Sequence, residues 1–176
     1  MKKGDVKTKR GFTIIEVSLV LAIAGLIFLM VFVALPSLQR GQRDAQRREA
    51  VMTYLEQLKK YQSNNRGALP NSITEWNAFL NNYLKNKNFF DPSGGDYRQD
   101  VVTCDQTTSN GVQVDAACNN SKINEVYSSY FPYNNYTMLV VTQASCNGDR
   151  PIKTSNPRNV AVLYRLEGAG VYCGNT

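Results

Sequence analysis

The sequence predicts an α+β fold in which one long N-terminal helix packs against a small antiparallel β-sheet. Two observations lead to this prediction. Good helix formers with helically spaced apolar residues follow the uncharged apolar run 17–35, so we expect one helix from residue 13 to about residue 63. Near the C-terminus, residues 136–143 and 159–166 are rich in β-branched and aromatic side chains, which is typical of strands.

The apolar run 17–35 has the length and composition of a membrane-spanning helix. A helix of nineteen residues is about 28 Å long, close to the roughly 30 Å of hydrocarbon in a bilayer. Secretory signal peptides have a shorter apolar region, about 7–15 residues, closed by a small-x-small cleavage site. Here the run ends in Leu35-Pro36-Ser37-Leu38 without such a site, so we expect the helix to stay in the chain and to span the membrane once.

The junction before this run reads KRGFTIIE over residues 9–16. Together with the apolar helix it resembles the class III leader of type IV prepilins and of pseudopilins, and the resemblance covers residues 9–35. It implies that prepilin peptidase, a membrane aspartic peptidase, cuts between Gly11 and Phe12 and methylates the new amine of Phe12. Residues 1–11 are then a basic leader peptide. Glycine fits such a cut because it has no side chain to obstruct an extended substrate.

Glu16 places a carboxylate at the start of the apolar helix. Deep in a bilayer this charge costs up to about 3 kcal/mol, so Glu16 is either a snorkelling interfacial residue or a group that awaits a cation. Cleavage after Gly11 creates a cation, the amine of Phe12, which stands one helical turn from Glu16 and allows a pair within one chain. The resemblance implies instead that Glu16 pairs with the amine of a neighbouring subunit and sets the stagger of a filament.

Gly25 and Pro36 stand out in the apolar helix. Pro36 removes the helical hydrogen bond to the carbonyl of Phe32, so we expect a kink. Both residue types are frequent in membrane helices, whereas the resemblance implies that the helix loosens between them when it packs into a filament. Pro36 lies about one turn later than the proline of the commonest bacterial pilins.

The second half of the helix, residues 39–63, is amphipathic. The basic residues within 40–48 are expected to form a solvated face, with contacts to lipid phosphates or acidic neighbours as the alternative. The apolar face is expected to consist of Ala45, Met52, Leu55, Leu58 and Tyr61.

The globular part of the chain, residues 64–176, begins with turn residues that end the long helix. Ser72 and Glu75 have the spacing of a capping box, which predicts a second short helix at 73–86. The turn-rich stretch that follows is expected to hold a short hairpin built from residues 101–102 and 112–114. A glycine-rich turn at 168–170 then leads into a last strand.

The four cysteines all follow the apolar run, and none belongs to a C-x-x-C pair. This pattern favours two disulfides in an oxidising compartment over zinc or redox chemistry. With the basic residues before the run, it indicates an N-terminus in the cytoplasm and a C-terminal part outside. Three pairings are possible. We favour Cys104–Cys118 and Cys146–Cys173, because the resemblance to pilins implies a bridge that brackets the C-terminal region.

The composition excludes several kinds of active site. The chain has no histidine, which rules out a Ser-His-Asp triad, a Cys-His pair and histidine-liganded metals. No G-x-S-x-G or P-loop motif occurs, and the spacing of Asp91, Asp96 and Asp100 fits no EF-hand. We therefore expect no enzymatic activity, no cofactor and no metal, with a membrane-anchored enzyme as the alternative.

The positive charge is concentrated at the N-terminus. Of the net charge of +6, residues 1–11 carry +4, from five basic residues and one acidic residue. A nucleic-acid-binding domain needs a basic surface, and the rest of the chain has little net charge. Binding of DNA is therefore an unsupported addition that only a local group can provide, formed by Arg150, Lys153 and Arg158.

The resemblance implies a structural subunit of a type IV pilus-like filament, with a pseudopilin of a type II secretion or DNA-uptake system as the alternative. The precursor spans the cytoplasmic membrane in contact with lipid until an assembly platform and its ATPase extract it. In the filament, residues 12–38 pack against other subunits at the centre. Residues 64–176 then form the surface of a fibre outside the cell.

Overall fold

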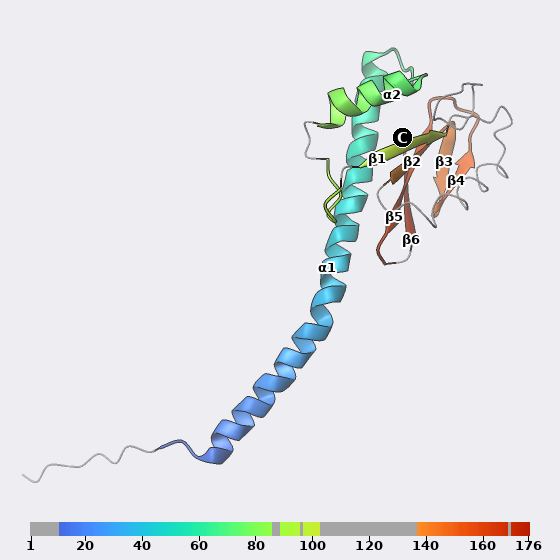
Figure 1. The fold of residues 1–176 in the computed structure, drawn as a ribbon. Coiled ribbons are helices and arrows are strands. Elements are labelled where there is room, and N and C mark those ends of the chain that lie inside the picture. The colour runs from blue at the N-terminus through green and yellow to red at the C-terminus, as the bar shows by residue number, and fades with distance from the viewer. Residues whose placement is uncertain (1–10, 86–88, 96, 103–136, 169) are drawn as a thin grey trace, which may run out of the picture. The chain divides into compact units, whose positions relative to one another are not determined.

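A computed structural model describes residues 11–85, 89–95, 97–102, 137–168 and 170–176. The chain divides into two compact units, Met1–Gln39 and Arg40–Thr176 (Figure 1). Helix α1, Ile14–Asn64, supplies residues to both units. The predicted long helix is confirmed, and its bounds differ from the expected ones by one residue at each end.

In the first unit, the described residues are three non-helical residues, 11–13, followed by the apolar half of α1. Gly25 and Pro36 both lie inside the helix, which continues through the proline. A proline in a helix lacks the N–H that the preceding turn needs as a donor. The chain is nevertheless helical on both sides of Pro36.

In the second unit, α1 packs with one face toward a β-sheet. The buried residues recur at helical spacing, as a core-facing stripe requires: Arg47, Val51, Tyr54, Leu55, Gln57 and Leu58. Leu55 and Leu58 were predicted correctly. Ala45 and Met52 were not, because both lie outside this stripe and are exposed, Met52 by 56%.

The C-terminus of α1 is closed by a Schellman-type turn. Arg66 adopts a left-handed conformation with φ of 57°, and the N–H of Gly67 donates to the carbonyl of Gln62 at 2.7 Å. Gly67 itself has φ of 84°, and a side chain there would also meet the guanidinium of Arg158. The left-handed backbone favours glycine at this position, whereas the exposed Arg158 side chain can move aside.

A second helix follows, as predicted. Helix α2 spans Ile73–Phe79 and continues as one π-helical turn, η1, Leu80–Leu84. The Ser72 hydroxyl accepts the N–H of Glu75, which confirms half of the capping box. The carboxylate of Glu75 accepts the N–H of Asn71 instead of that of Ser72, so the reciprocal bond is displaced by one residue.

Four strands form the main sheet in the order β1-β2-β5-β6. Their bounds are β1 Arg98–Val102, β2 Thr137–Thr142, β5 Val160–Leu166 and β6 Gly170–Asn175. The last three strands are antiparallel, as predicted, but β1 runs parallel to β2. The sheet is therefore mixed rather than antiparallel. Parallel neighbours need a long crossover connection, and the stretch of chain between β1 and β2 is long enough to allow one.

A separate hairpin consists of β3, Ala144–Asn147, and β4, Arg150–Lys153. Sequence analysis missed it, because the segment contains a proline and few β-branched residues. The hairpin turns back between β2 and β5 and so places Cys146 beside Cys173 of β6. Their Cα atoms are 5.8 Å apart, and the predicted Cys146–Cys173 disulfide is confirmed. Cys104 and Cys118, like residues 112–114 of the predicted hairpin, lie outside the described residues.

The sheet buries apolar side chains on both faces. One face joins α1 and α2 in the larger core, which includes Val101, Met138, Val140, Val160, Val162 and Tyr164. The other face carries a smaller cluster that Cys146 and Cys173 adjoin: Val102, Leu139, Val141, Ala144, Ala161 and Leu163. Gly174 of β6 lets α1 approach closely, since a Cβ there would lie 2.9 Å from Leu55 and 3.1 Å from Val51.

Candidate functional site

The predicted cleavage junction lies in non-helical backbone before α1. Gly11, Phe12 and Thr13 precede the first helical residue, Ile14. Phe12 is 89% exposed, and among the described residues, the chain neighbours of Gly11 aside, no atom lies within 4 Å of the position that a Cβ on Gly11 would occupy. The peptide bond between Gly11 and Phe12 is thus open to an enzyme that binds extended chains.

Glu16 forms a capping box with Thr13 at the start of α1. The N–H and the hydroxyl of Thr13 both donate to Oε2 of Glu16, at 2.9 and 2.8 Å. The N–H of Glu16 in turn donates to the Thr13 hydroxyl at 3.3 Å. Sequence analysis missed this pair, although the T-x-x-E spacing before an apolar run is its signature.

The capping box bears on the predicted pair between the Glu16 carboxylate and the Phe12 amine of the same chain. Phe12 lies before the first helical turn, so Phe12 and Glu16 do not occupy one helix face. The one-turn spacing was predicted on the assumption that the helix begins at Phe12, whereas α1 begins at Ile14. A pair within one chain stays a prediction, because Thr13, the residue after Phe12, already contacts the Glu16 carboxylate. Glu16 is also not an acid without partners, because its own chain supplies two donors.

The apolar half of α1 is long and apolar enough to cross a membrane. Its best eighteen-residue window has a mean hydropathy of 2.9, and none of that window is buried. Large side chains stay exposed along its length, as Leu21 at 67%, Phe28 at 65% and Val33 at 74% illustrate. This exposure distinguishes the segment from a core helix, which would bury its apolar residues.

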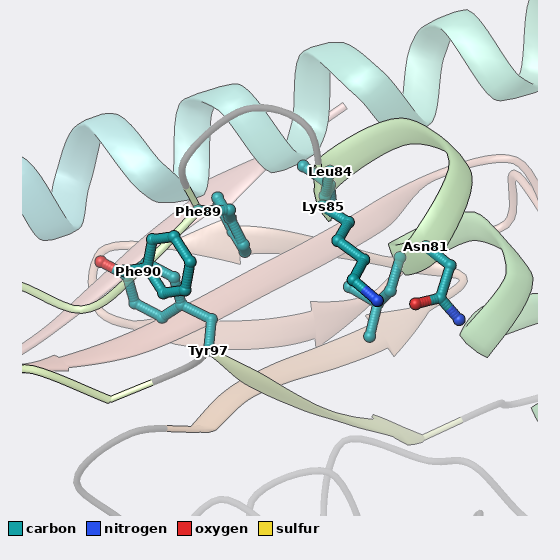
Figure 2. Close-up of a pocket in the computed structure, with 7 residues that line it drawn as sticks. Asn81, Leu84, Lys85, Phe89, Phe90 and Tyr97 are labelled. Carbon is teal, nitrogen blue, oxygen red and sulfur yellow. The ribbon is translucent and has the colours of Figure 1, made fainter.

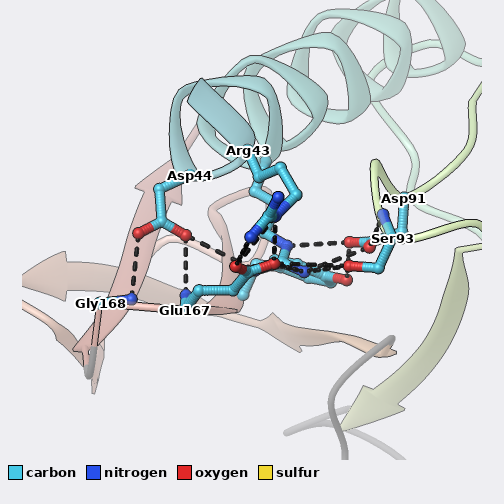
Figure 3. Close-up of polar contacts among 8 residues, drawn as sticks. Arg43, Asp44, Asp91, Ser93, Glu167 and Gly168 are labelled. Carbon is cyan, nitrogen blue, oxygen red and sulfur yellow. Dashed lines mark hydrogen bonds and ion pairs between the residues drawn. The ribbon is translucent and has the colours of Figure 1, made fainter. Parts of the chain in front are cut away.

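In the second unit, a buried ion pair links α1 to the segment before β1 (Figure 3). Nε of Arg47 lies 2.9 Å from Oδ2 of Asp91, and these residues are only 4% and 2% exposed. The Ser93 hydroxyl accepts a hydrogen bond from Arg47, and the Tyr164 hydroxyl donates to Asp91 at 2.6 Å. Asp44 and Glu167 also contact Arg47, at 3.5 and 3.1 Å. Arg47 was expected on a solvated face, and that prediction is wrong because Asp91 accompanies it into the core.

The electrostatics of this pair follow from its contacts. Burial by itself raises the pKa of Asp91, but the hydrogen bonds from Arg47, Tyr164 and Ser93 outweigh burial and lower it to about 2. Burial likewise opposes the charge on Arg47, and the hydrogen bond and charge of Asp91 outweigh it, so the pKa of Arg47 is raised. Burial and the bond to Asp91 raise the pKa of Tyr164. The carboxylate of Asp91 and the guanidinium of Arg47 are therefore both held in their charged forms.

Around this pair, a more exposed group ties the turn between β5 and β6 to α1. Arg43 makes a two-pronged contact with the carboxylate of Glu167, the shortest distance being 2.7 Å. Asp44 accepts the N–H groups of Glu167 and Gly168 at 2.7 and 3.1 Å (Figure 3). The basic stretch of the helix thus includes two arginines that anchor the globular unit.

A pocket of about 310 Å³ lies beside η1 and the segment before β1 (Figure 2). Its lining is mainly aliphatic and aromatic, with one charged side chain: Leu80, Asn81, Leu84, Lys85, Phe89, Phe90 and Tyr97. This lining pairs no nucleophile with a general base. Nor do the residues that the structure describes contain a group of three or more acidic or cysteine side chains able to hold a metal ion.

The three residues considered for DNA contact, Arg150, Lys153 and Arg158, are all exposed. Arg150 and Lys153 lie in β4, and both take part in interactions. The guanidinium of Arg158 lies against Gly67 at the end of α1. Binding of DNA by this local basic group stays a prediction.

No known protein family, curated protein or solved structure matches this chain.

Proposed function

We propose that this protein is a structural subunit of a type IV pilus-like filament, processed after Gly11 and polymerised through residues 12–38. One observation carries the proposal. The apolar half of α1 leaves its large side chains exposed, and it lies directly behind the KRGFTIIE junction. Exposed apolar surface of this extent marks contact with a membrane or with other proteins.

In the proposed cycle of assembly, the apolar helix contacts first the membrane and then other subunits. Before assembly, the apolar helix lies in the cytoplasmic membrane with its N-terminus in the cytoplasm, where prepilin peptidase cuts after Gly11 and methylates Phe12. An assembly platform and its ATPase then move the subunit out of the bilayer. The helix exchanges lipid for equivalent helices of other subunits, and the globular unit becomes part of the surface of the fibre outside the cell.

Within this cycle, Glu16 pairs with the amine of Phe12 from another subunit. A carboxylate and an amine attract each other far more strongly in an apolar interior than in water. The choice of a neighbouring chain as the source of the amine rests on the resemblance to pilins. As a filament subunit, the protein would need neither catalytic residues nor a cofactor.

Processing provides the direct test of this function. We expect mass spectrometry of the N-terminal peptide from native material to give a chain that begins with N-methylated Phe12. A Gly11→Leu variant is expected to remain uncut, because the new side chain obstructs the extended substrate, and to run as a larger band on a gel. Gly25→Leu is the matched control, since it inserts the same side chain farther along the helix and should be cut normally. Native chains that still begin with Met1 would contradict the proposal.

The pairing role of Glu16 is tested by assembly. We expect Glu16→Ala to be inserted and cut normally, yet to lower the amount of sheared filament by about tenfold or more, because the carboxylate that pairs with the amine is lost. Glu56→Ala is the matched control, because Glu56 is an exposed glutamate of the same helix. Abundant normal filaments from Glu16→Ala would remove the pairing role.

A further inference from the structure

We propose that the pocket beside η1 binds a small aromatic carboxylate, with the ring of the ligand against Phe89 and Phe90 and its carboxylate on Lys85 and Asn81. The proposed assembly does not use this pocket, so the inference does not rest on the proposed function. The volume of the pocket is about 310 Å³, which lies at the lower end of the range for small-molecule sites. A pocket of this size suits a ligand of one or two rings.

The aromatic wall of the pocket is held in place by the core of the globular unit. The ring centroids of Phe89 and Tyr97 are 4.5 Å apart, and that of Tyr97 lies 5.3 Å from the centroid of Tyr164. Tyr97 and Tyr164 are both buried. The wall therefore has its shape without a ligand, and binding costs little ordering of side chains.

Phe90 is the exposed part of this wall. Its side chain is 58% exposed, whereas every other aromatic side chain described in the globular unit is buried or half-buried. Covering such a ring removes apolar surface from water, and a second ring adds the preferred aromatic contact. Phe90 thus favours an aromatic ligand over an aliphatic one.

The polar end of the pocket lies on the π-helical turn. The N–H of Lys85 donates to the carbonyl of Leu80, five residues earlier, as a π-helix requires. Asn81 and Lys85 stand four positions apart on this turn, and Figure 2 shows their polar tips at the end of the lining away from Phe90. Single π-helical turns occur frequently at functional sites. This one brings an amide and an ammonium group to the same end of the pocket.

The charge of the pocket favours an anion. Lys85 is the one charged residue of the lining, and it makes no ion pair within the part of the chain that the structure describes. Asp91, which follows Phe90 in the chain, is buried against Arg47 and so does not neutralise Lys85. An ammonium group forms its strongest hydrogen bonds with carboxylate or phosphate oxygens. A flat ring that carries one carboxylate therefore matches both ends of the pocket.

The test uses the full chain in lipid nanodiscs, with naphthylacetate as the probe. Equilibrium dialysis measures the bound probe, and empty nanodiscs give the blank. We expect one site per chain, half-saturated at about 1 mM or below, the value for a ligand of this size with ordinary efficiency. Naphthylethanol has the same rings but no charge, and it should bind about fivefold more weakly, the factor for one partly exposed ion pair.

Two variants at the surface locate the two ends of the ligand. Lys85→Met keeps the apolar stem without the charge, and it should lower the affinity for naphthylacetate to that for naphthylethanol while leaving the latter unchanged. Phe90→Ala removes the exposed ring and should weaken both probes about fivefold. Lys59→Met is the matched control, because Lys59 is an exposed lysine outside the lining, and it should change neither affinity.

Four results would overturn the inference. Dialysis with no saturable binding above the blank removes the site, and naphthylethanol that binds as tightly as naphthylacetate removes the selection of an anion. Unchanged affinity in Lys85→Met places the carboxylate elsewhere on the chain. Unchanged affinity in Phe90→Ala places the rings elsewhere. None of these results touches the proposed filament, which is tested separately by processing and assembly.

Discussion

Replacing Asp91 with alanine is expected to lower the free energy of unfolding of the globular unit by about 3 kcal/mol, the lower end of the range for breaking a buried ion pair. The variant leaves Arg47 charged in the core, where it is only 4% exposed. It also removes the acceptor of the buried Tyr164 hydroxyl. The cost does not reach the upper end of the range, because Glu167 still contacts Arg47 at 3.1 Å.

The measurement is chemical unfolding of the full chain in detergent micelles, followed by the fluorescence of Trp76. This side chain is the single tryptophan, and it is 1% exposed in the core of the globular unit. Arg43→Ala is the matched control, because its pair with Glu167 is partly exposed at 33% and 24% and should contribute below about 1 kcal/mol. An Asp91→Ala variant as stable as this control contradicts the expectation.

The same variant should change the response to acid. The pKa of Asp91 is lowered from 3.8 to about 2 in the folded chain, so its ionised form favours folding. This contribution is complete above pH 3.8, the unfolded value, and is lost as pH falls toward 2. Wild-type stability should therefore decrease over this interval through Asp91, and Asp91→Ala should lack that part of the decrease.

The secondary structure with the strongest local pattern was predictable. A run of nineteen uncharged residues and two strands rich in β-branched residues identified α1, β2 and β5 without knowledge of tertiary contacts. The bond from Thr13 to Glu16 was also readable, since a capping box depends on four consecutive residues. It was overlooked because the charge of Glu16 was considered without its neighbours.

Features that depend on distant residues were not predictable. Arg47 belongs to a basic stretch that is typical of a solvated face, and its burial depends on Asp91, 44 residues later in the chain. The parallel pairing of β1 with β2 has a similar origin, because five residues with one apolar end do not specify the direction of their neighbour. The sequence pattern records local preference, whereas these contacts result from packing across the whole unit.

Removal of the Cys146–Cys173 disulfide is expected to destabilise the globular unit by about 3–4 kcal/mol, the loop-closure value for a bridge of this length. The bridge spans 27 residues and joins the β3–β4 hairpin to β6. Without it, the unfolded chain gains conformational freedom, and the hairpin is held over the smaller core only by noncovalent contacts.

A Cys146→Ala/Cys173→Ala variant tests this expectation in the same unfolding experiment. Removing both sulfurs avoids a reactive free thiol, and hydrogen exchange should increase first in β3 and β4, where the covalent tie is lost. Ser145→Ala is the matched control, since it changes a half-exposed neighbour in the same strand and should cost below about 0.5 kcal/mol. Equal stability of the double variant and this control would show that packing alone fixes the hairpin, and the cysteine pair would then need another explanation.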